Sequence, residues 1–207
     1  MDTYFQNAAS GWDTPQRVRR AQCIARELRQ HIPFSHCKLA VEYGCGTGLV
    51  GLNLADIADL LILTDPEPSM LDILRQKLEL LPAGRRPELL CQPLDESLPR
   101  ELHCDLIFHS MALHHTRDAG RALRNAFDAL VPGGCLCFAD LDPEDGHFHD
   151  DHPDFHGYNG FEQTELQDLM RDVGFVEVAS RTFLQDSKSV NGQPHPFSLF
   201  WMCGLHP

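Results

Sequence analysis

An acidic residue followed by three glycines at alternate positions is the stretch of this chain that most directly suggests chemistry. A short apolar run ends in Glu42, and Gly44, Gly46 and Gly48 follow before an apolar pattern of helical period begins. Glycine adopts positive φ without steric cost, and it lets a ligand lie directly against backbone N–H groups. The pattern therefore predicts a buried strand, a tight turn and a helix N-terminus that together hold a nucleotide-like ligand.

Two ligand classes use such a turn, and Glu42 favours one of them. The run from Gly46 to Gly51 also fits G-x-G-x-x-G, the pyrophosphate fingerprint of dinucleotide enzymes. A carboxylate just before the glycines is unfavourable to a diphosphate, but it suits a ligand with an ammonium group or with hydrogen-bond donors. S-adenosylmethionine has these features and no phosphate. An NAD(P)-dependent oxidoreductase and a purely structural turn remain the alternatives at this point.

Two later segments fit the same kind of site. A second apolar run ends in Asp65, where a carboxylate can accept two hydroxyl hydrogen bonds from a ribose in a strong, charge-assisted arrangement. A third apolar unit begins at Cys104 and runs through His109 to the pair His114 and His115. Histidine is the side chain best matched to proton transfer near neutral pH.

In order along the chain, these motifs resemble those of the class I S-adenosylmethionine-dependent methyltransferases. The resemblance includes the run Gln92-Pro-Leu-Asp95 and the run from Leu130-Val-Pro-Gly-Gly to Asp140, and it covers residues 10–204. It is strongest toward the small-molecule branch that includes the ubiquinone/menaquinone-biosynthesis type. The resemblance implies in-line methyl transfer from S-adenosylmethionine, with S-adenosylhomocysteine as product, to an O, N, C or S nucleophile. The acceptor is expected to be a small molecule, which the sequence does not identify. A catalytically silent binding protein with the same fold is a further alternative.

The resemblance also implies roles for individual residues. Glu42 and the three glycines are expected beside the amino-acid part of the donor, and Asp65 at the ribose. The residues expected beside the adenine and the methionyl end are Pro66, Met70, Leu94, Asp95, His109 and Ser110. Asp95 could instead cap the turn that contains Ser97. His114 is expected to face the acceptor as the catalytic residue.

Composition excludes several functional classes. The chain has 207 residues, with 17 Lys and Arg against 30 Asp and Glu and a formal charge of -13. Such a surface repels nucleic-acid backbones, so nucleic acid is not expected as substrate. No apolar stretch reaches the length of a membrane span, and the N-terminus does not resemble a secretory signal. Eight scattered cysteines without a C-x-x-C pair favour a reduced, cytoplasmic protein.

The elements that must position these residues alternate between strand-like and helical patterns. We expect one domain over 1–207, beginning with a helix over 15–31. The expected strands are 38–43, 60–64, 88–91, 104–109, 134–140, 175–184 and 196–204, and the other expected helices are 48–57, 67–80, 118–130 and 162–172. The last two strands have only a polar loop, 186–193, between them, which predicts an antiparallel hairpin. The expected fold is therefore an α/β, Rossmann-like three-layer sandwich. Its seven-stranded sheet is mostly parallel and ends in that hairpin.

The segment 141–160 holds four histidines and five aspartates and follows the fifth expected strand. Ligands of open α/β sheets bind at the carboxyl ends of strands, so this loop should overhang the acceptor. We expect a polar substrate lid and no bound metal. The alternatives are a pH-sensitive role and a metal site formed by the loop histidines, which are His147, His149, His152 and His156.

Overall fold

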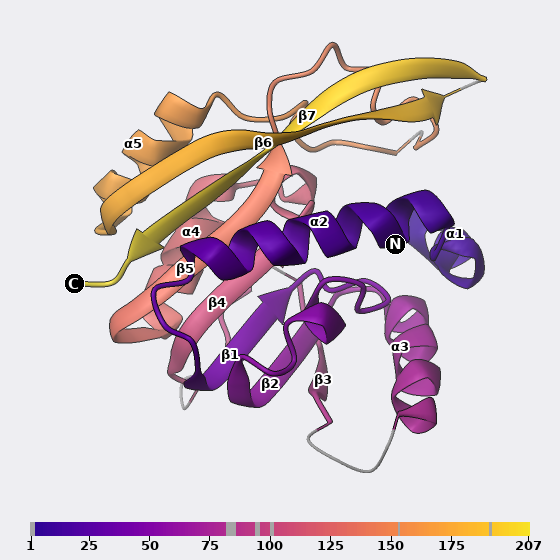
Figure 1. Cartoon of the computed structure of the whole chain (residues 1–207). Coiled ribbons are helices and arrows are strands. Elements are labelled where there is room, and N and C mark those ends of the chain that lie inside the picture. Colours follow the sequence, from indigo (N-terminus) through magenta and orange to yellow (C-terminus); the bar gives the residue numbers. More distant parts are fainter. Residues whose placement is uncertain (1–2, 82–85, 94–95, 100–101, 153, 191) are drawn as a thin grey trace.

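Figure 1 shows the computed structural model of the chain, which describes residues 3–81, 86–93, 96–99, 102–152, 154–190 and 192–207. Within these residues a seven-stranded sheet runs in the order β3-β2-β1-β4-β5-β7-β6. The strands are β1 (Cys37–Tyr43), β2 (Ala58–Asp65), β3 (Glu88–Cys91), β4 (Cys104–Ser110), β5 (Leu130–Leu141), β6 (Val176–Val190) and β7 (Gln193–Leu205). The first five pair in parallel, whereas β7 is antiparallel to both β5 and β6. The predicted fold class is confirmed.

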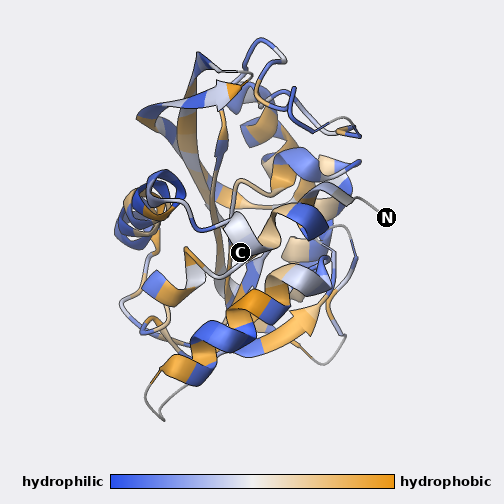
Figure 2. Cartoon of the chain, turned by 90° about the vertical axis from the view of Figure 1, so that its right-hand side faces the viewer, coloured by the Kyte–Doolittle hydropathy of each residue, from blue (hydrophilic) through white to orange (hydrophobic). Residues whose placement is uncertain are grey.

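Helices cover both faces of the sheet. They are α1 (Thr3–Ala8), α2 (Pro15–His31), α3 (Pro68–Leu80), α4 (Ala119–Ala129) and α5 (Gln163–Val173), with the 3-10 turns η1 (Ala9–Gly11), η2 (Gly51–Asn53) and η3 (Leu113–His115). Apolar residues of α2 and α3 share one buried core with the sheet, and those of α4 and α5 share a second core on the opposite face. As a consequence, the helices are amphipathic, and in Figure 2 they are coloured partly orange (hydrophobic) and partly blue (hydrophilic).

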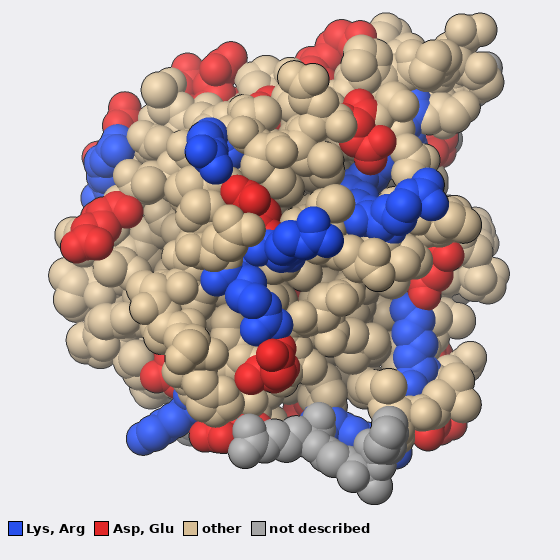
Figure 3. Space-filling view, viewed as in Figure 1, with Lys and Arg blue, Asp and Glu red and all other residues tan. Residues whose placement is uncertain are grey.

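The helix α2 begins where the sequence predicts a helix start. The hydroxyl of Thr14 accepts a hydrogen bond from the backbone N–H of Arg17 at 3.3 Å, and Pro15 occupies the first helical turn. Ala21, Ile24 and Leu28 are buried against the sheet. Lys and Arg side chains gather over the outer side of this helix, as Figure 3 shows.

Two local predictions are wrong. The segment expected as a helix over 48–57 forms successive turns and the single 3-10 turn η2, with N–H groups bonding mainly three residues back. Gly48 has φ +80° and starts the segment outside the helical region. The polar residues expected as a loop over 186–193 mostly continue β6 and β7, so the hairpin is longer than predicted. The short helix α1 is an element that the sequence patterns did not reveal.

The cysteines differ in part from the expectation of a fully reduced protein. Cys137 of β5 and Cys203 of β7 lie directly opposite each other and form a disulfide. The cysteine spacing in the sequence gave no hint of this pair, because only the antiparallel register brings the two residues together. The free cysteines are Cys23, Cys37, Cys45, Cys91, Cys104 and Cys135.

No helix in the described part of the chain combines the length and the apolar character that crossing a membrane requires.

The turn after β1 packs so closely against Ala112, the residue before η3, that only glycine fits there. Gly44 has φ +62°, and a Cβ added there would lie 2.6 Å from the Cβ of Ala112. We therefore expect Gly44→Ala to lower the free energy of unfolding by about 2–4 kcal/mol, from left-handed backbone strain and from overpacking together. Denaturant unfolding measures this.

Gly133→Ala is the matched control. Gly133 has φ +81° but no atom within 4 Å of an added Cβ, so it should show only the backbone strain, about 1–2 kcal/mol. Equal losses in the two variants would contradict the packing contact with Ala112.

Candidate functional site

A cavity of about 610 Å³ lies at the carboxyl ends of the parallel strands. The glycine turn after β1 and the segment after β2 form one half of its wall, and η3 and the histidine-rich loop form part of the other half. A volume of this size is typical of a site for a small-molecule ligand. For clarity we call the two parts the donor half and the acceptor half, according to the parts of the ligands that the sequence predicts there.

In the donor half, backbone hydrogen bonds fix the position of the Asp65 carboxylate. Its carboxylate accepts hydrogen bonds from the backbone N–H of Gly46 at 2.7 Å and of Glu67 at 2.9 Å. Each oxygen keeps a lone pair for a further donor, because a carboxylate oxygen can accept more than one hydrogen bond. Burial raises the pKa of Asp65 to about 6, although the two N–H groups act in the opposite direction. The two N–H groups thus fix the position of the carboxylate. Keeping it ionised in this buried place costs free energy unless further hydrogen-bond donors bind it.

The glycine turn is also tied to two other parts of the chain. The hydroxyl of Thr47 donates to Asp13 at 2.5 Å, and the ammonium of Lys77 bonds both Asp13 at 2.5 Å and the Thr47 carbonyl at 2.6 Å. Gly46 has φ +54°, and the atom nearest to an added Cβ there is the indole nitrogen of Trp12 at 3.7 Å. The turn is therefore fixed by α3 and by the segment before α2, while its middle glycine borders the cavity.

Glu42 lies beneath the turn and does not line the cavity. A Cβ on Gly51 would lie 2.2 Å from its Oε2 atom, so the carboxyl is packed under that glycine. Burial raises the pKa of Glu42 well above its usual value, and the charge of Asp65 adds to this effect. Gly48 is also absent from the wall. A direct contact of Glu42 with the donor stays a prediction, and the structure places the residue as a support of the turn.

The other predicted donor residues divide into three groups. Pro66, Met70 and Ser110 line the cavity, and so does Pro93, which was not among the predicted residues. Leu94 and Asp95 lie outside the described residues. His109 is buried next to the cavity wall without lining it, and its ring stacks on Phe138 with centroids 4.4 Å apart. Burial lowers the pKa of His109 to about 4, so this ring is neutral at neutral pH.

His114 lines the cavity and is paired with Asp140, and its predicted contact with the acceptor stays a prediction. Its Nδ1 lies 2.5 Å from Oδ1 of Asp140, whose carboxylate also accepts from the backbone N–H groups of Leu113 at 3.0 Å and Leu141 at 2.8 Å. Burial raises the pKa of Asp140, but the neighbouring His114 ring outweighs burial and the net shift is downward. Nδ1–H donates to this carboxylate, which leaves the Nε2 lone pair of a neutral ring available. Nε2 is buried and has no hydrogen-bond partner among the described residues.

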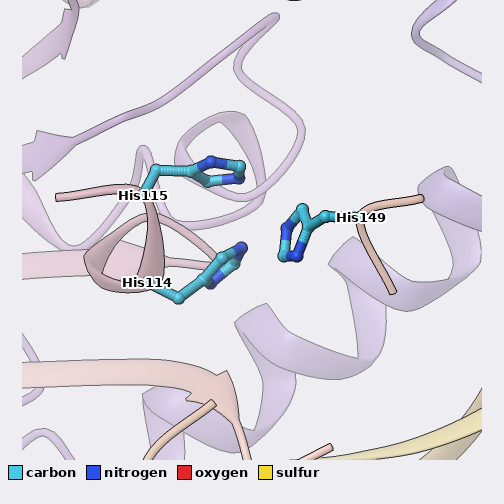
Figure 4. Close-up of side chains that lie close together, drawn as sticks. All are labelled: His114, His115 and His149. Atoms are coloured by element: carbon cyan, nitrogen blue, oxygen red, sulfur yellow. The ribbon is translucent and has the colours of Figure 1, made fainter. Parts of the chain in front are cut away.

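Two more histidines stand beside His114. His115 follows it in η3, and His149 reaches the same space from the histidine-rich loop (Figure 4). Burial lowers the pKa of His149 to about 3 and that of His115 well below its usual value, and the neighbouring histidines lower both further. Both rings are therefore neutral near pH 7. The sequence analysis did not connect these two residues with each other.

The acceptor half contains further residues that the sequence analysis missed. Tyr4, Phe5 and Trp12 cover it from the N-terminal segment, and Arg17, Arg20 and Lys188 reach it from α2 and β6. The sequence does contain a signal for Tyr4, Phe5 and Trp12, because these aromatic residues lie close together ahead of the first predicted helix. Asp140 had a clearer signal, because it ends an apolar run just as Asp65 does.

The histidine-rich loop borders the cavity through Phe148, His149 and Asp151. Its four histidines do not converge. His147 is exposed and lies 2.8 Å from Asp150, His156 is exposed, and the ring of His152 stacks on Tyr4. The closing motion expected of a lid stays a prediction.

Known proteins agree with this architecture. Residues 41–136 match the family model of a methyltransferase domain, whereas no curated protein sequence matches the chain. A SAM-dependent methyltransferase from Thermotoga maritima, a possible histamine N-methyltransferase, is 21% identical with a TM-score of 0.72, and the match covers 98% of each chain.

Two further solved structures share the fold. Phosphoethanolamine N-methyltransferase 2 from Haemonchus contortus, in complex with S-adenosyl-L-methionine, is 14% identical with a TM-score of 0.67 and is matched over 91% of this chain and 52% of that one. Magnesium protoporphyrin IX methyltransferase from Synechocystis, with bound SAM, is 16% identical with a TM-score of 0.62, over 91% and 79%. Residues 41–136 therefore match a methyltransferase domain, and the chain has the fold of these solved methyltransferases.

Proposed function

We propose that the protein transfers a methyl group from S-adenosylmethionine to a small-molecule acceptor. The observation that carries the proposal is the position of Asp65, whose oriented carboxylate borders the same cavity as the glycine turn and His114. The location in the cytoplasm and the donor contacts of individual residues are predictions that accompany this proposal.

The residues of the donor half fit this donor. The two ribose hydroxyls would donate to the Asp65 carboxylate, which has lone pairs to accept them and would regain by these bonds part of what burial costs it. Gly46 leaves the backbone open to a ligand, since no atom but the Trp12 indole lies near the position of a Cβ. Pro66 and Met70 supply apolar surface where the adenine is expected.

The chain has two tasks in the reaction. When bound, S-adenosylmethionine supplies a methyl group that its sulfonium charge already activates for in-line displacement. The protein must align the acceptor and exclude water, and alignment alone can be worth about 7–11 kcal/mol. The aromatic residues Tyr4, Phe5 and Trp12 line the cavity, and their rings would help to exclude water once both ligands are bound.

His114 is the proposed catalytic residue. Its Nδ1 is held by Asp140, which fixes the orientation of the ring, and the residue lines the cavity. This nitrogen can take up a proton from an N–H, O–H or S–H acceptor, a contribution of about 10²–10⁴-fold where a proton must leave. The acceptor itself is a small molecule on this proposal, because the cavity volume of about 610 Å³ is typical of a site for a small-molecule ligand.

Asp65→Ala tests the ribose assignment. We expect binding of S-adenosylhomocysteine to weaken by about 1.5–3 kcal/mol, the range for hydrogen bonds to a charged group. Isothermal titration calorimetry measures the affinity, and circular dichroism shows that the fold persists. Asp72→Ala is the control, because Asp72 lies exposed on α3 next to Arg75, away from the cavity. An unchanged affinity in Asp65→Ala would contradict the assignment.

The affinity for S-adenosylhomocysteine should also depend on pH through Asp65. The hydroxyls donate to the ionised carboxylate, so binding is favoured above the pKa of about 6 and lost as the pH falls through it. At pH 5 about a tenth of the carboxyl is ionised, and the affinity should fall by up to roughly tenfold from its value at pH 7.5. Asp65→Asn should lack this part of the pH dependence. Parallel profiles for the two proteins would show that another group titrates.

A further inference from the structure

Three histidine rings from two separate parts of the chain meet in the acceptor half of the cavity. His114 and His115 belong to η3, whereas His149 belongs to the loop after β5. One ring nitrogen of each lies within 4.8 Å of the others, and Figure 4 shows the three rings turned toward one space. In the described part of the chain, no other group of three or more His, Cys, Asp or Glu side chains has this spacing.

Three of the ring nitrogens in this cluster lack partners. Nε2 of His114 and both ring nitrogens of His149 are buried, and none of them has a hydrogen-bond partner among the described residues. The ring of His149 cannot easily turn toward water, because it stacks on Phe155 with centroids 3.6 Å apart and planes within 6° of parallel. Unpaired buried nitrogens destabilise a fold, so their convergence indicates a ligand that would satisfy them together.

The geometry points to a divalent-metal site, in which His114, His115 and His149 bind one transition-metal ion of the zinc class. Imidazole suits Zn, Cu, Fe and Ni, and three histidines with an open fourth position are typical of catalytic zinc. Ligand nitrogens around a tetrahedral zinc ion lie about 3.3 Å apart, so the rings would have to close by on the order of 1 Å.

The surroundings of the cluster support a metal ion. Asp140 holds Nδ1 of His114 at 2.5 Å, which is the carboxylate–histidine arrangement that orients metal ligands and raises their basicity. Phe5 lies against His115 with centroids 5.1 Å apart, and Phe148 lies against His149 at 4.9 Å, so apolar rings limit the access of water. Lys188, a cation that also lines the cavity, is paired with Asp151 at 2.6 Å.

The site differs from the one that the loop sequence suggested. Of the four histidines in the loop, His149 belongs to this cluster. The other two members, His114 and His115, come from η3, after β4. The open position faces the acceptor half, so an acceptor with a thiol, hydroxyl or carboxylate group could bind the ion there. This last step rests on the proposed function. With an ion bound, Nε2 of His114 would be a metal ligand and could not itself take up a proton, so the ion would activate the acceptor in its place.

Metal titration of the full chain tests the site without any acceptor. Chelator-washed protein is titrated with ZnCl2 alone by calorimetry, and Co²⁺ serves as a visible spectroscopic probe of nitrogen coordination. We expect one ion per chain, a raised melting temperature, and a loss of affinity of at least tenfold in His149→Ala and in His115→Ala. Asp140→Asn should weaken binding by about 10–100-fold, as expected for a residue that positions a ligand.

His147→Ala is the matched control. It removes a histidine from the same loop, but this residue is exposed and paired with Asp150, so the affinity should not change. No saturable binding to the wild-type protein, unchanged binding in the folded His149→Ala and His115→Ala variants, or a loss in His147→Ala instead would each overturn the proposal. If one of the two cluster variants fails to fold, the other decides.

S-adenosylhomocysteine is titrated into the same samples. Binding of this product shows that a variant is folded and keeps its donor half. Zinc binding without S-adenosylhomocysteine binding would leave the metal site standing and remove the proposed function. The opposite result would remove the metal site alone.

Discussion

The structure of this site depends on two buried carboxylates at strand ends. Asp65 ends β2 and accepts backbone N–H groups from the turn after β1 and from its own following segment. Asp140, near the end of β5, repeats the arrangement with N–H groups from η3, after β4, and from Leu141. Burying an ionised carboxyl costs several kcal/mol, and charge-assisted hydrogen bonds of about 1.5–3 kcal/mol each offset that cost. Each carboxylate thereby fixes the segment that follows a neighbouring strand.

The two carboxylates give the two halves of the cavity different chemical properties. Asp65 keeps unsatisfied lone pairs toward the cavity, which suits a ligand rich in hydroxyl donors. Asp140 instead orients the ring of His114, which also lines the cavity. On the proposed function, Asp65 would bind the ligand directly, whereas Asp140 would act by orienting this ring. Burial raises the pKa of Asp65, whereas the neighbouring His114 contributes to the lowered pKa of Asp140.

Sequence reasoning predicted the donor half better than the acceptor half, for a physical reason. β1 and β2 are apolar runs that end at or beside an acidic residue, so Asp65 and the glycines can be recognised locally. The helix expected over 48–57 failed because Gly48 and Gly51 allow tight turns where the apolar spacing alone suggests a helix. The acceptor half is assembled from η3, the loop, α1 and the tip of the hairpin. Contacts between such distant segments leave no periodic pattern in the sequence.

On the proposed function, the cavity binds S-adenosylmethionine in preference to a dinucleotide. Calorimetric titration of the wild-type protein with S-adenosylmethionine, S-adenosylhomocysteine and NAD(H) under the same conditions tests this preference most directly. We expect saturable binding of both sulfur nucleosides at one site per chain, each tighter than NAD(H). Tighter binding of NAD(H) than of both sulfur nucleosides would contradict it.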